Sequence, residues 1–74
     1  MPHVIVKLFA GRSERDKQRL ADELTKVVMN VIGSSEKSVS VSIVDIKPSD
    51  WTEKVYKPDI VARPDTIYKK PDYN

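Results

Sequence analysis

The sequence predicts an α+β fold built from one strand–helix–strand unit with a C-terminal extension. Two short segments in which apolar and polar residues alternate predict the strands, and a longer segment between them with apolar residues at helical spacing predicts the helix. The connection is long enough for a crossover helix, so we expect the strands to be parallel and the crossover to be right-handed.

The first strand is predicted over residues 2–9. Its apolar residues Val4, Val6 and Leu8 share one face, and His3, Ile5 and Lys7 share the other. Because side chains alternate along a strand, one face is expected to be buried more deeply.

The helix is predicted over residues 14–32. Ser13 is a suitable N-cap, Asp16 suits the positive end of the helix dipole, and Gly33 is placed to end the helix. Five apolar residues form its buried stripe: Leu20, Leu24, Val27, Val28 and Val31.

The second strand is predicted over residues 38–46, with Val39, Val41 and Ile43 on one face and serines on the other. Pro48 ends it. Residues 49–74 are predicted to form a short helix from Trp51 to Tyr56, capped by Ser49, and then turns. The turns are expected at three prolines: Pro58, Pro64 and Pro71.

The chain has 74 residues and no cysteine, so we expect a single domain, residues 1–74, without disulfides. A two-stranded sheet with one helix is not stable alone. Pairing two copies edge to edge gives a four-stranded sheet with two helices on one face. A homo-oligomer, with a dimer preferred over a hexamer, is therefore expected.

The charges favour a solvated surface over a nucleic-acid interface. Thirteen basic and 11 acidic residues are interleaved and give a formal net charge of +2, whereas a nucleic-acid footprint is a patch of one sign. No segment resembles a signal peptide or is long enough to span a membrane. We expect a cytoplasmic protein that binds neither nucleic acid nor membrane.

Few residues could perform catalysis. His3 is the only histidine, no acidic residues show metal-ligand spacing, and no phosphate-binding loop is present, so neither metal nor cofactor is expected. The remaining candidate is Pro2, whose secondary amine becomes free once Met1 is removed. An α-amino group titrates near ~8, and an apolar pocket lowers that value toward neutrality, which suits a general base.

The chain resembles the 4-oxalocrotonate tautomerase family. The resemblance rests on Met1-Pro2 before an alternating strand, on Gly11-Arg12-Ser13 before the helix, on Ser38-Val39-Ser40-Val41, and on Trp51. The closing segment from Lys69 to Tyr73 resembles a longer-tailed branch that is associated with dimers.

The resemblance implies a tautomerase fold and a keto–enol isomerase. In that reading Pro2 is the catalytic base, Arg12 binds the substrate carboxylate, and Trp51 forms an apolar wall. The substrate would be a small carboxylate-bearing enol or keto acid.

One position departs from the family. The founding enzymes carry a second arginine where this chain has Ser40, so a monocarboxylate such as an enolpyruvate fits better than a dicarboxylate. Four residues could supply a replacement charge: Lys7, Lys54, Lys57 or Arg63. His3 follows Pro2 but should point to the opposite face, so it is interpreted as a surface residue.

Two alternatives stay open. A dehalogenase or hydratase would use a protonated Pro2 and a carboxylate that activates water, with Glu53 or Asp50 as candidates. A non-enzymatic binding module would leave Pro2 without a role, and it would be favoured if Met1 stayed attached, because a Met–Pro amide has no basic nitrogen.

Overall fold

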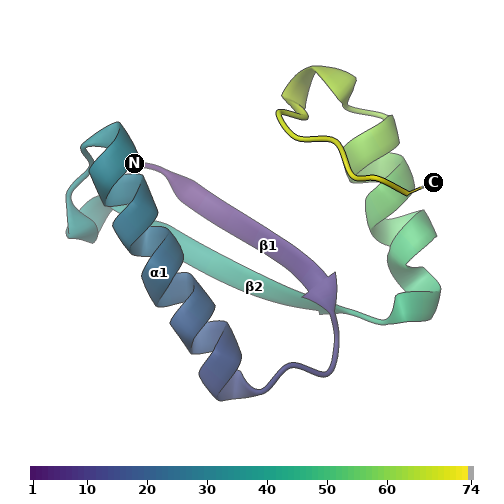
Figure 1. Ribbon diagram of the computed structural model, residues 1–74, viewed down its shortest axis with the longest axis horizontal. Coiled ribbons are helices and arrows are strands. Elements are labelled where there is room, and N and C mark those ends of the chain that lie inside the picture. Colours follow the sequence, from purple (N-terminus) through teal and green to yellow (C-terminus); the bar gives the residue numbers. More distant parts are fainter. Residues whose placement is uncertain (74) are drawn as a thin grey trace.

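The computed structural model describes residues 1–73, so Asn74, the last residue of the predicted domain, lies outside the described part. Two strands and one long helix form the N-terminal unit, and short helices follow (Figure 1). In chain order the elements are β1 (His3–Phe9), α1 (Glu14–Ile32), η1 (Glu36–Ser38), β2 (Ser40–Ile46), η2 (Pro48–Asp50), η3 (Thr52–Val61) and η4 (Pro64–Thr66). The predicted α+β class and the order of strand, helix and strand are confirmed.

β1 and β2 form a two-stranded parallel sheet in which His3 lies opposite Ser40. Two further backbone hydrogen bonds extend the ladder. The Ser40 N–H donates to the Pro2 carbonyl at 3.2 Å, and the Ala10 N–H donates to the Ile46 carbonyl at 2.8 Å. Because side chains alternate along each strand, residues paired in this register share one side of the sheet.

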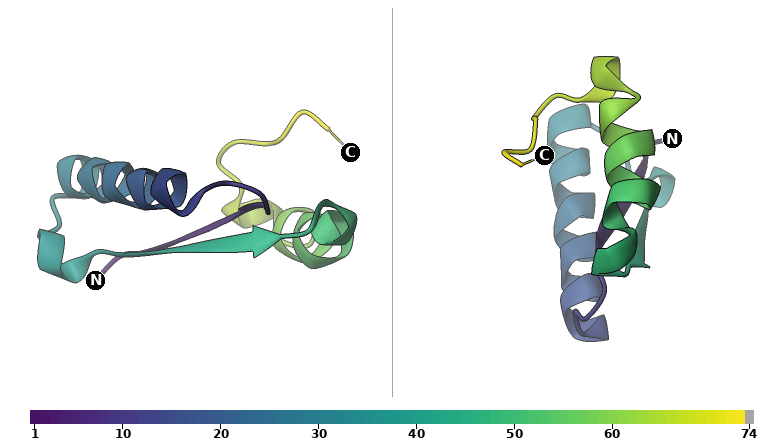
Figure 2. Two further views of the ribbon diagram at one scale, coloured as in Figure 1. Left: turned by 90° about the horizontal axis from the view of Figure 1, so that it is seen from below. Right: turned by 90° about the vertical axis from the view of Figure 1, so that its right-hand side faces the viewer.

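α1 lies over one face of this sheet (Figure 2). This inner face carries mainly apolar side chains: Val4, Val6, Leu8, Val41 and Ile43. The outer face carries a mixture of polar and apolar side chains: His3, Ile5, Lys7 and Phe9 from β1, and Ser40, Ser42, Val44 and Ile46 from β2. The alternation in the sequence therefore predicted both faces of β1.

Both ends of α1 have the caps that the sequence predicts. Ser13 Oγ accepts a hydrogen bond from the Asp16 N–H at 3.1 Å, which satisfies one of the unpaired donors of the first turn. At the other end, Gly33 adopts φ 80°, a left-handed conformation that costs glycine little, and its N–H donates to the Met29 carbonyl at 3.0 Å.

Lys17 ties the first turn of α1 to β2. Its Nζ lies 2.5 Å from a Glu14 carboxylate oxygen and 3.0 Å from a carboxylate oxygen of Asp45. The hydrogen bond to Glu14, followed by the one to Asp45, raises the pKa of Lys17 above its ordinary value of 10.5. Both contacts thus favour the charged ammonium, which joins the first turn of α1 to β2.

The second half of the chain corrects four predictions. β2 begins at Ser40, two residues later than predicted, because the N–H and the hydroxyl of Ser38 both donate to the Ser35 carbonyl and close a 3₁₀ turn. The predicted helix from Trp51 to Tyr56 is instead η3, a π-helix that continues through Pro58.

Pro58 does not end this helix, and Ser49 does not cap it. The backbone of η3 follows the wider i→i+5 pattern, in which the Ala62 N–H donates to the Lys57 carbonyl at 3.0 Å. The steric conflict of a proline ring with the preceding turn of an α-helix is avoided in this pattern. Ser49 lies inside η2, and η3 has no side-chain cap.

The chain buries little apolar surface by itself. Within residues 1–73, Val55 is the only hydrophobic residue that counts as buried, at 5% exposure. Large apolar side chains remain exposed on both the sheet and α1, including Ile5 at 57% and Val31 at 75%. A chain of this size with so small a core is marginal, which is the physical reason to expect a partner.

We predict that Ser13→Ala lowers the free energy of unfolding by about 1 kcal/mol, because it removes the side-chain cap of α1. Thermal or urea unfolding at fixed protein concentration measures the change. Ser35→Ala is the matched control, since Ser35 precedes a helix but makes no side-chain cap bond. Equal effects of the two substitutions would contradict the capping role.

Candidate active site

Pro2 lies at the N-terminal end of β1, one residue before the strand begins. Its carbonyl accepts the hydrogen bond from the Ser40 N–H, so the β1–β2 ladder holds its backbone in place. The residue is half-buried, whereas the Met1 side chain before it is fully exposed. Removal of Met1 would therefore disturb no packed side chain.

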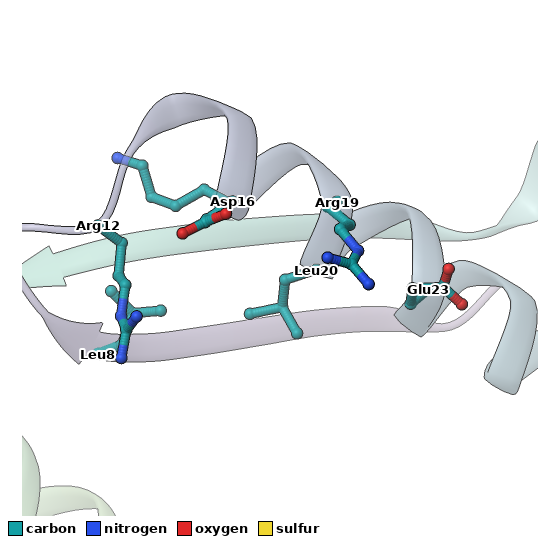
Figure 3. A pocket seen from close by; sticks show the side chains of 7 residues that line it. Leu8, Arg12, Asp16, Arg19, Leu20 and Glu23 are labelled. Atoms are coloured by element: carbon teal, nitrogen blue, oxygen red, sulfur yellow. The ribbon is translucent and has the colours of Figure 1, made fainter.

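Arg12 lies at the opposite end of β1, in the turn that leads into α1. Gly11, immediately before it, has φ 124°, a conformation that side chains other than glycine rarely adopt. Arg12 is exposed, and it lines a hollow of about 330 Å³ beside the β1 side of α1. Leu8 and Leu20 supply apolar parts of the lining, and Figure 3 shows both side chains directed to the same side as Arg12.

Trp51 lies near the same end of β1 but in a different hollow. Its ring meets Phe9 edge to face, with centroids 5.1 Å apart and planes at 82°. Its indole N–H donates to the Tyr73 hydroxyl at 2.9 Å, and the Tyr73 ring lies 5.6 Å from the ring of Tyr56. Phe9, Pro48, Trp51, Thr52 and Tyr73 line the hollow.

Tyr73 belongs to this aromatic cluster although the sequence gives it no such role. A tail tyrosine 22 positions from Trp51 shows no spacing that would connect the two residues. Tyr73 is the one aromatic residue of the closing segment from Lys69 to Tyr73, and this pattern does not identify its partner. The contact between Trp51 and Tyr73 is therefore visible only in the folded structure.

One chain does not bring the three predicted site residues together. Pro2 precedes the first residue of β1, whereas Arg12 and Trp51 lie near its last residue. Seven steps at about 3.3 Å each separate Pro2 from Phe9 by roughly 23 Å. Arg12 and Trp51 line separate hollows, although Leu8 and Phe9, which line one hollow each, are neighbours in the chain.

The three lysines considered as a replacement charge each form an ion pair with a carboxylate. Lys7 pairs with Asp59 of η3 across the outer face of the sheet. Lys54 pairs with Asp50 at 3.3 Å, and Lys57 pairs with Glu53 at 2.7 Å. The last two pairs engage Asp50 and Glu53, the carboxylates considered for water activation. Arg63, the fourth candidate cation, is exposed and is in none of these pairs.

His3 makes a contact that the sequence did not predict. Its Nδ1 lies 2.6 Å from Ser40 Oγ on the outer face of the sheet. His3 is exposed on that face, as the alternation predicts, but its partner was not predicted. Ser40, the first residue of β2, could not be assigned to His3 until the register was known, because a shift by one residue moves every side chain to the other face.

The described residues contain no group of three or more histidine, cysteine or acidic side chains that could hold a metal ion. Over the same residues, no helix combines the length and the apolar character that a membrane span requires.

Comparison with protein families gives a match over residues 2–54 to a family described as tautomerase enzyme. A relative from Xylella fastidiosa that carries the name probable tautomerase is 44% identical over 73 residues, covering 99% of this chain and 89% of the relative. Tautomerase PptA of Cronobacter sakazakii is 40% identical over 74 residues, covering 99% of this chain and 97% of that protein.

Solved structures give the same result for the strand–helix–strand unit. A 4-oxalocrotonate tautomerase isozyme from Methylibium petroleiphilum superposes with a TM-score of 0.66 at 28% identity, over 68% of this chain and 81% of the other. The tautomerase homologue TomN of the tomaymycin biosynthetic pathway also gives 0.66 at 28% identity, over 68% of this chain and 77% of its own.

We predict that Tyr73→Phe shifts the fluorescence of Trp51, the only tryptophan of the chain, toward longer wavelength. The substitution keeps the ring but removes the hydroxyl that accepts from the indole N–H, and a net loss of about 0.5–1.5 kcal/mol per hydrogen bond loosens the tail around the indole. Tyr68→Phe is the control because Tyr68 is 99% exposed. An unchanged spectrum for Tyr73→Phe would contradict the contact.

Proposed function

Because the chain belongs to the tautomerase enzyme family, we propose that it catalyses keto–enol proton transfer on a small 2-oxo or 2-hydroxy unsaturated acid, with the Pro2 amine as base. The observation that carries the proposal is that the family match begins at Pro2 and that Pro2 directly precedes β1, the first strand of the fold. The comparisons support isomerase activity in general, and the substrate and the base are our proposal.

The proposed reaction needs one proton carrier. After Met1 is removed, the neutral amine of Pro2 takes the proton from the enol hydroxyl while the C–O bond becomes a carbonyl. The same nitrogen then returns the proton to the neighbouring carbon, and the substrate leaves with unchanged composition. The ring fixes φ, so the lone pair points in one direction and is ready for transfer.

Arg12 supports the recognition of an acid. Its guanidinium presents two parallel N–H donors that match a carboxylate, and it stays charged at any relevant pH. Leu8 and Leu20 beside it offer apolar contacts to the rest of the acid. In the two-chain site proposed below, Trp51 of the partner subunit, which packs on its own Phe9, would be the apolar wall that helps to keep the amine of Pro2 neutral.

We further propose that two copies complete the site. β1 has β2 as its only strand neighbour, so its other edge offers unpaired backbone groups. On α1, three apolar residues at helical spacing remain exposed: Leu20, Val27 and Val31. Antiparallel pairing of two β1 strands would satisfy the edge and cover these side chains, which gives the four-stranded sheet with two helices on one face.

Antiparallel pairing of two β1 strands would also bring the separated site residues, Pro2 and Arg12, close to each other. In an antiparallel pair, the N-terminal end of one β1 lies beside the C-terminal end of the other. Pro2 of one protomer then approaches Arg12 of the partner subunit, although the two lie at opposite ends of β1 within a chain. We therefore prefer a homodimer with two shared sites, and larger assemblies are not needed to form them.

Two features of the sequence bear on the proposed substrate and on the proposed location of the protein in the cell. Ser40 has no positive charge of its own, so a substrate with one carboxylate fits better than one with two. A cytoplasmic location is supported by composition alone, since a chain without cysteine does not depend on an oxidising compartment.

No observation favours the dehalogenase or hydratase reading. Asp50 and Glu53, the carboxylates considered for water activation, both form ion pairs with lysines of η3. The binding-module reading is tested by the same experiments as the proposal.

We predict that Pro2→Ala lowers the rate of phenylenolpyruvate ketonisation by at least about 100-fold, the usual contribution of a positioned base. Ultraviolet absorbance follows the reaction, and intact mass establishes that Met1 is absent from each sample. Protein that retains Met1 is expected to be inactive, because its Pro2 nitrogen is an amide. Pro64→Ala, in the first position of η4, is the control. Full activity of Pro2→Ala would refute the mechanism.

A second prediction tests the shared site. Pro2→Ala and Arg12→Gln proteins are each expected to be nearly inactive, but equal mixtures that have exchanged subunits should regain about a quarter of wild-type activity. About half of the dimers are then mixed, and one of their two sites combines an intact Pro2 with an intact Arg12.

Arg15→Gln serves as the matched control for this experiment, because Arg15 lies on α1 but does not line the Arg12 hollow. An equal mixture of Pro2→Ala with Arg15→Gln should show about half of wild-type activity. If the first mixture stays as inactive as its components after subunit exchange, Pro2 and Arg12 do not act across two chains.

A further inference from the structure

We propose that a row of four charged residues on α1 recognises the same row on a second copy of this chain and selects the antiparallel dimer. The four residues, called the charged row, are all exposed: Asp16, Arg19, Glu23 and Lys26. The inference rests on the two-copy part of the proposed function, and it names the side chains that would choose the orientation and the register of the partner.

The spacing of the charged row places it on one side of α1. Its members follow one another at intervals of three, four and three positions, and residues at these intervals are neighbours on the surface of a helix with 3.6 residues per turn. All four line one shallow hollow on the outside of α1. Leu20 and Val27 directly follow Arg19 and Lys26 in the chain, and they are 36% and 54% exposed. The row therefore borders the apolar side chains that a second copy would cover.

The order of charges makes the row self-complementary. From Asp16 to Lys26 the signs are negative, positive, negative and positive. A second copy that runs in the opposite direction presents the reversed order, so each position of the row meets the opposite sign. A parallel copy in the same register would place like charges beside each other. Charges that flank an apolar seam between two helices set partner and orientation in this way.

The sheet places the centre of the row at the expected two-fold axis. Ala21, the middle position of the row, lines a hollow together with Val41 and Ile43 of β2. These two residues pair with Val4 and Val6 of β1, and Val6 is the middle residue of that strand. A two-fold axis through the middle of an antiparallel pair of β1 strands would therefore pass at the level of Ala21 in both copies.

The dimensions of the sheet would bring the two helices into contact. Each α1 lies over its own two-stranded sheet (Figure 2), and strands are about 4.8 Å apart, so the two helix axes would be roughly 9.6 Å apart. Packed helices lie at about 8–10 Å. With the axis at Ala21, Arg19 would face Glu23 of the partner subunit, and Asp16 would face the partner's Lys26. The two-fold symmetry repeats both contacts.

The charges of the row are available to a partner. Within residues 1–73, Asp16 and Arg19 take part in no ion pair. Lys26 and Glu23 are 3.7 Å apart, and their side chains are 68% and 60% exposed. An exposed pair of this kind contributes little stability, so both side chains can turn toward opposite charges on a second copy.

The row also covers one end of the hollow that Arg12 lines. Figure 3 shows Arg12 and Leu8 at one end of this hollow, and Arg19 and Glu23 toward the other. A partner helix on the charged row would cover the second end and leave the Arg12 end to the substrate. Arg19 would thus bind the partner, although it is a second guanidinium in the same hollow.

Charge reversal tests the row without any substrate. Arg19→Glu would place two carboxylates opposite each other at both symmetric contacts, and Glu23→Arg would place two guanidiniums there. Each variant should dimerise at least about tenfold more weakly than the wild type in sedimentation velocity, because attraction is replaced by repulsion at two positions. A chain with both substitutions regains opposite charges, so its dissociation constant should return to within about threefold of the wild-type value.

An equal mixture of the two single variants gives the sharper test. In a mixed dimer, both carboxylates of the Arg19→Glu chain would face both guanidiniums of the Glu23→Arg chain. After subunit exchange, native mass spectrometry should find that mixed dimers make up at least about four fifths of all dimers, whereas random assortment gives about half.

A mixture of Arg15→Glu with Asp22→Arg is the matched control, because it changes the charge of the same helix by the same amounts. With the axis at Ala21, these positions would face the partner's Val27 and the partner's Leu20, which are uncharged. Mixed dimers should therefore be about half of this control.

Three results would overturn the inference: a wild-type chain that stays monomeric, an excess of mixed dimers that is absent or equal in the two mixtures, or a doubly substituted chain that dimerises as weakly as the single variants. Ketonisation by wild-type and Pro2→Ala protein is measured separately. The excess of mixed dimers together with a fully active Pro2→Ala protein would refute the Pro2 mechanism and leave the charged row in place.

Discussion

The structure depends on the parallel pairing of β1 with β2, which uses only one edge of β1. This pairing fixes which side chains share a face, and it places α1 over the inner face. It also leaves too little buried surface for a stable monomer: Val55 alone is buried among the described residues. The free edge of β1 and the exposed apolar side of α1 both result from this small sheet, and the proposed second copy of the chain would cover both.

Two ion pairs hold the remaining segments on this small sheet. Lys17 joins α1 to Asp45 of β2, and Lys7 joins β1 to Asp59 of η3. Both are partly exposed, so each contributes little stability, but each removes a cation from the set that a substrate could use. Arg12 takes part in none of these pairs, and it lines its hollow together with Arg19.

The features that local chemistry decides were predictable from the sequence. Ser13 and Gly33 set the two ends of α1, because capping needs only residues within one turn. The alternation of β1 gave its faces for the same reason. Pro58 was misjudged, because the rule that proline ends a helix applies to the α-helical hydrogen-bond pattern, and η3 follows a wider one.

Contacts between distant residues could not be predicted in this way. The contact of His3 with Ser40 spans 37 positions, and that of Trp51 with Tyr73 spans 22. Each depends on a register or on a tail position that no local pattern encodes. Pro2, Arg12 and Trp51 were selected from the sequence as one site, yet a single chain separates Pro2 from the other two by the length of β1.

The distance between Pro2 and Arg12 within one chain determines how the proposed site would have to be assembled. A base at one end of a strand and a carboxylate-binding arginine at the other can meet only where two strands run in opposite directions. The interface that would stabilise the chain would then also assemble its catalytic groups, so folding, assembly and activity would have a common dependence on the edge of β1.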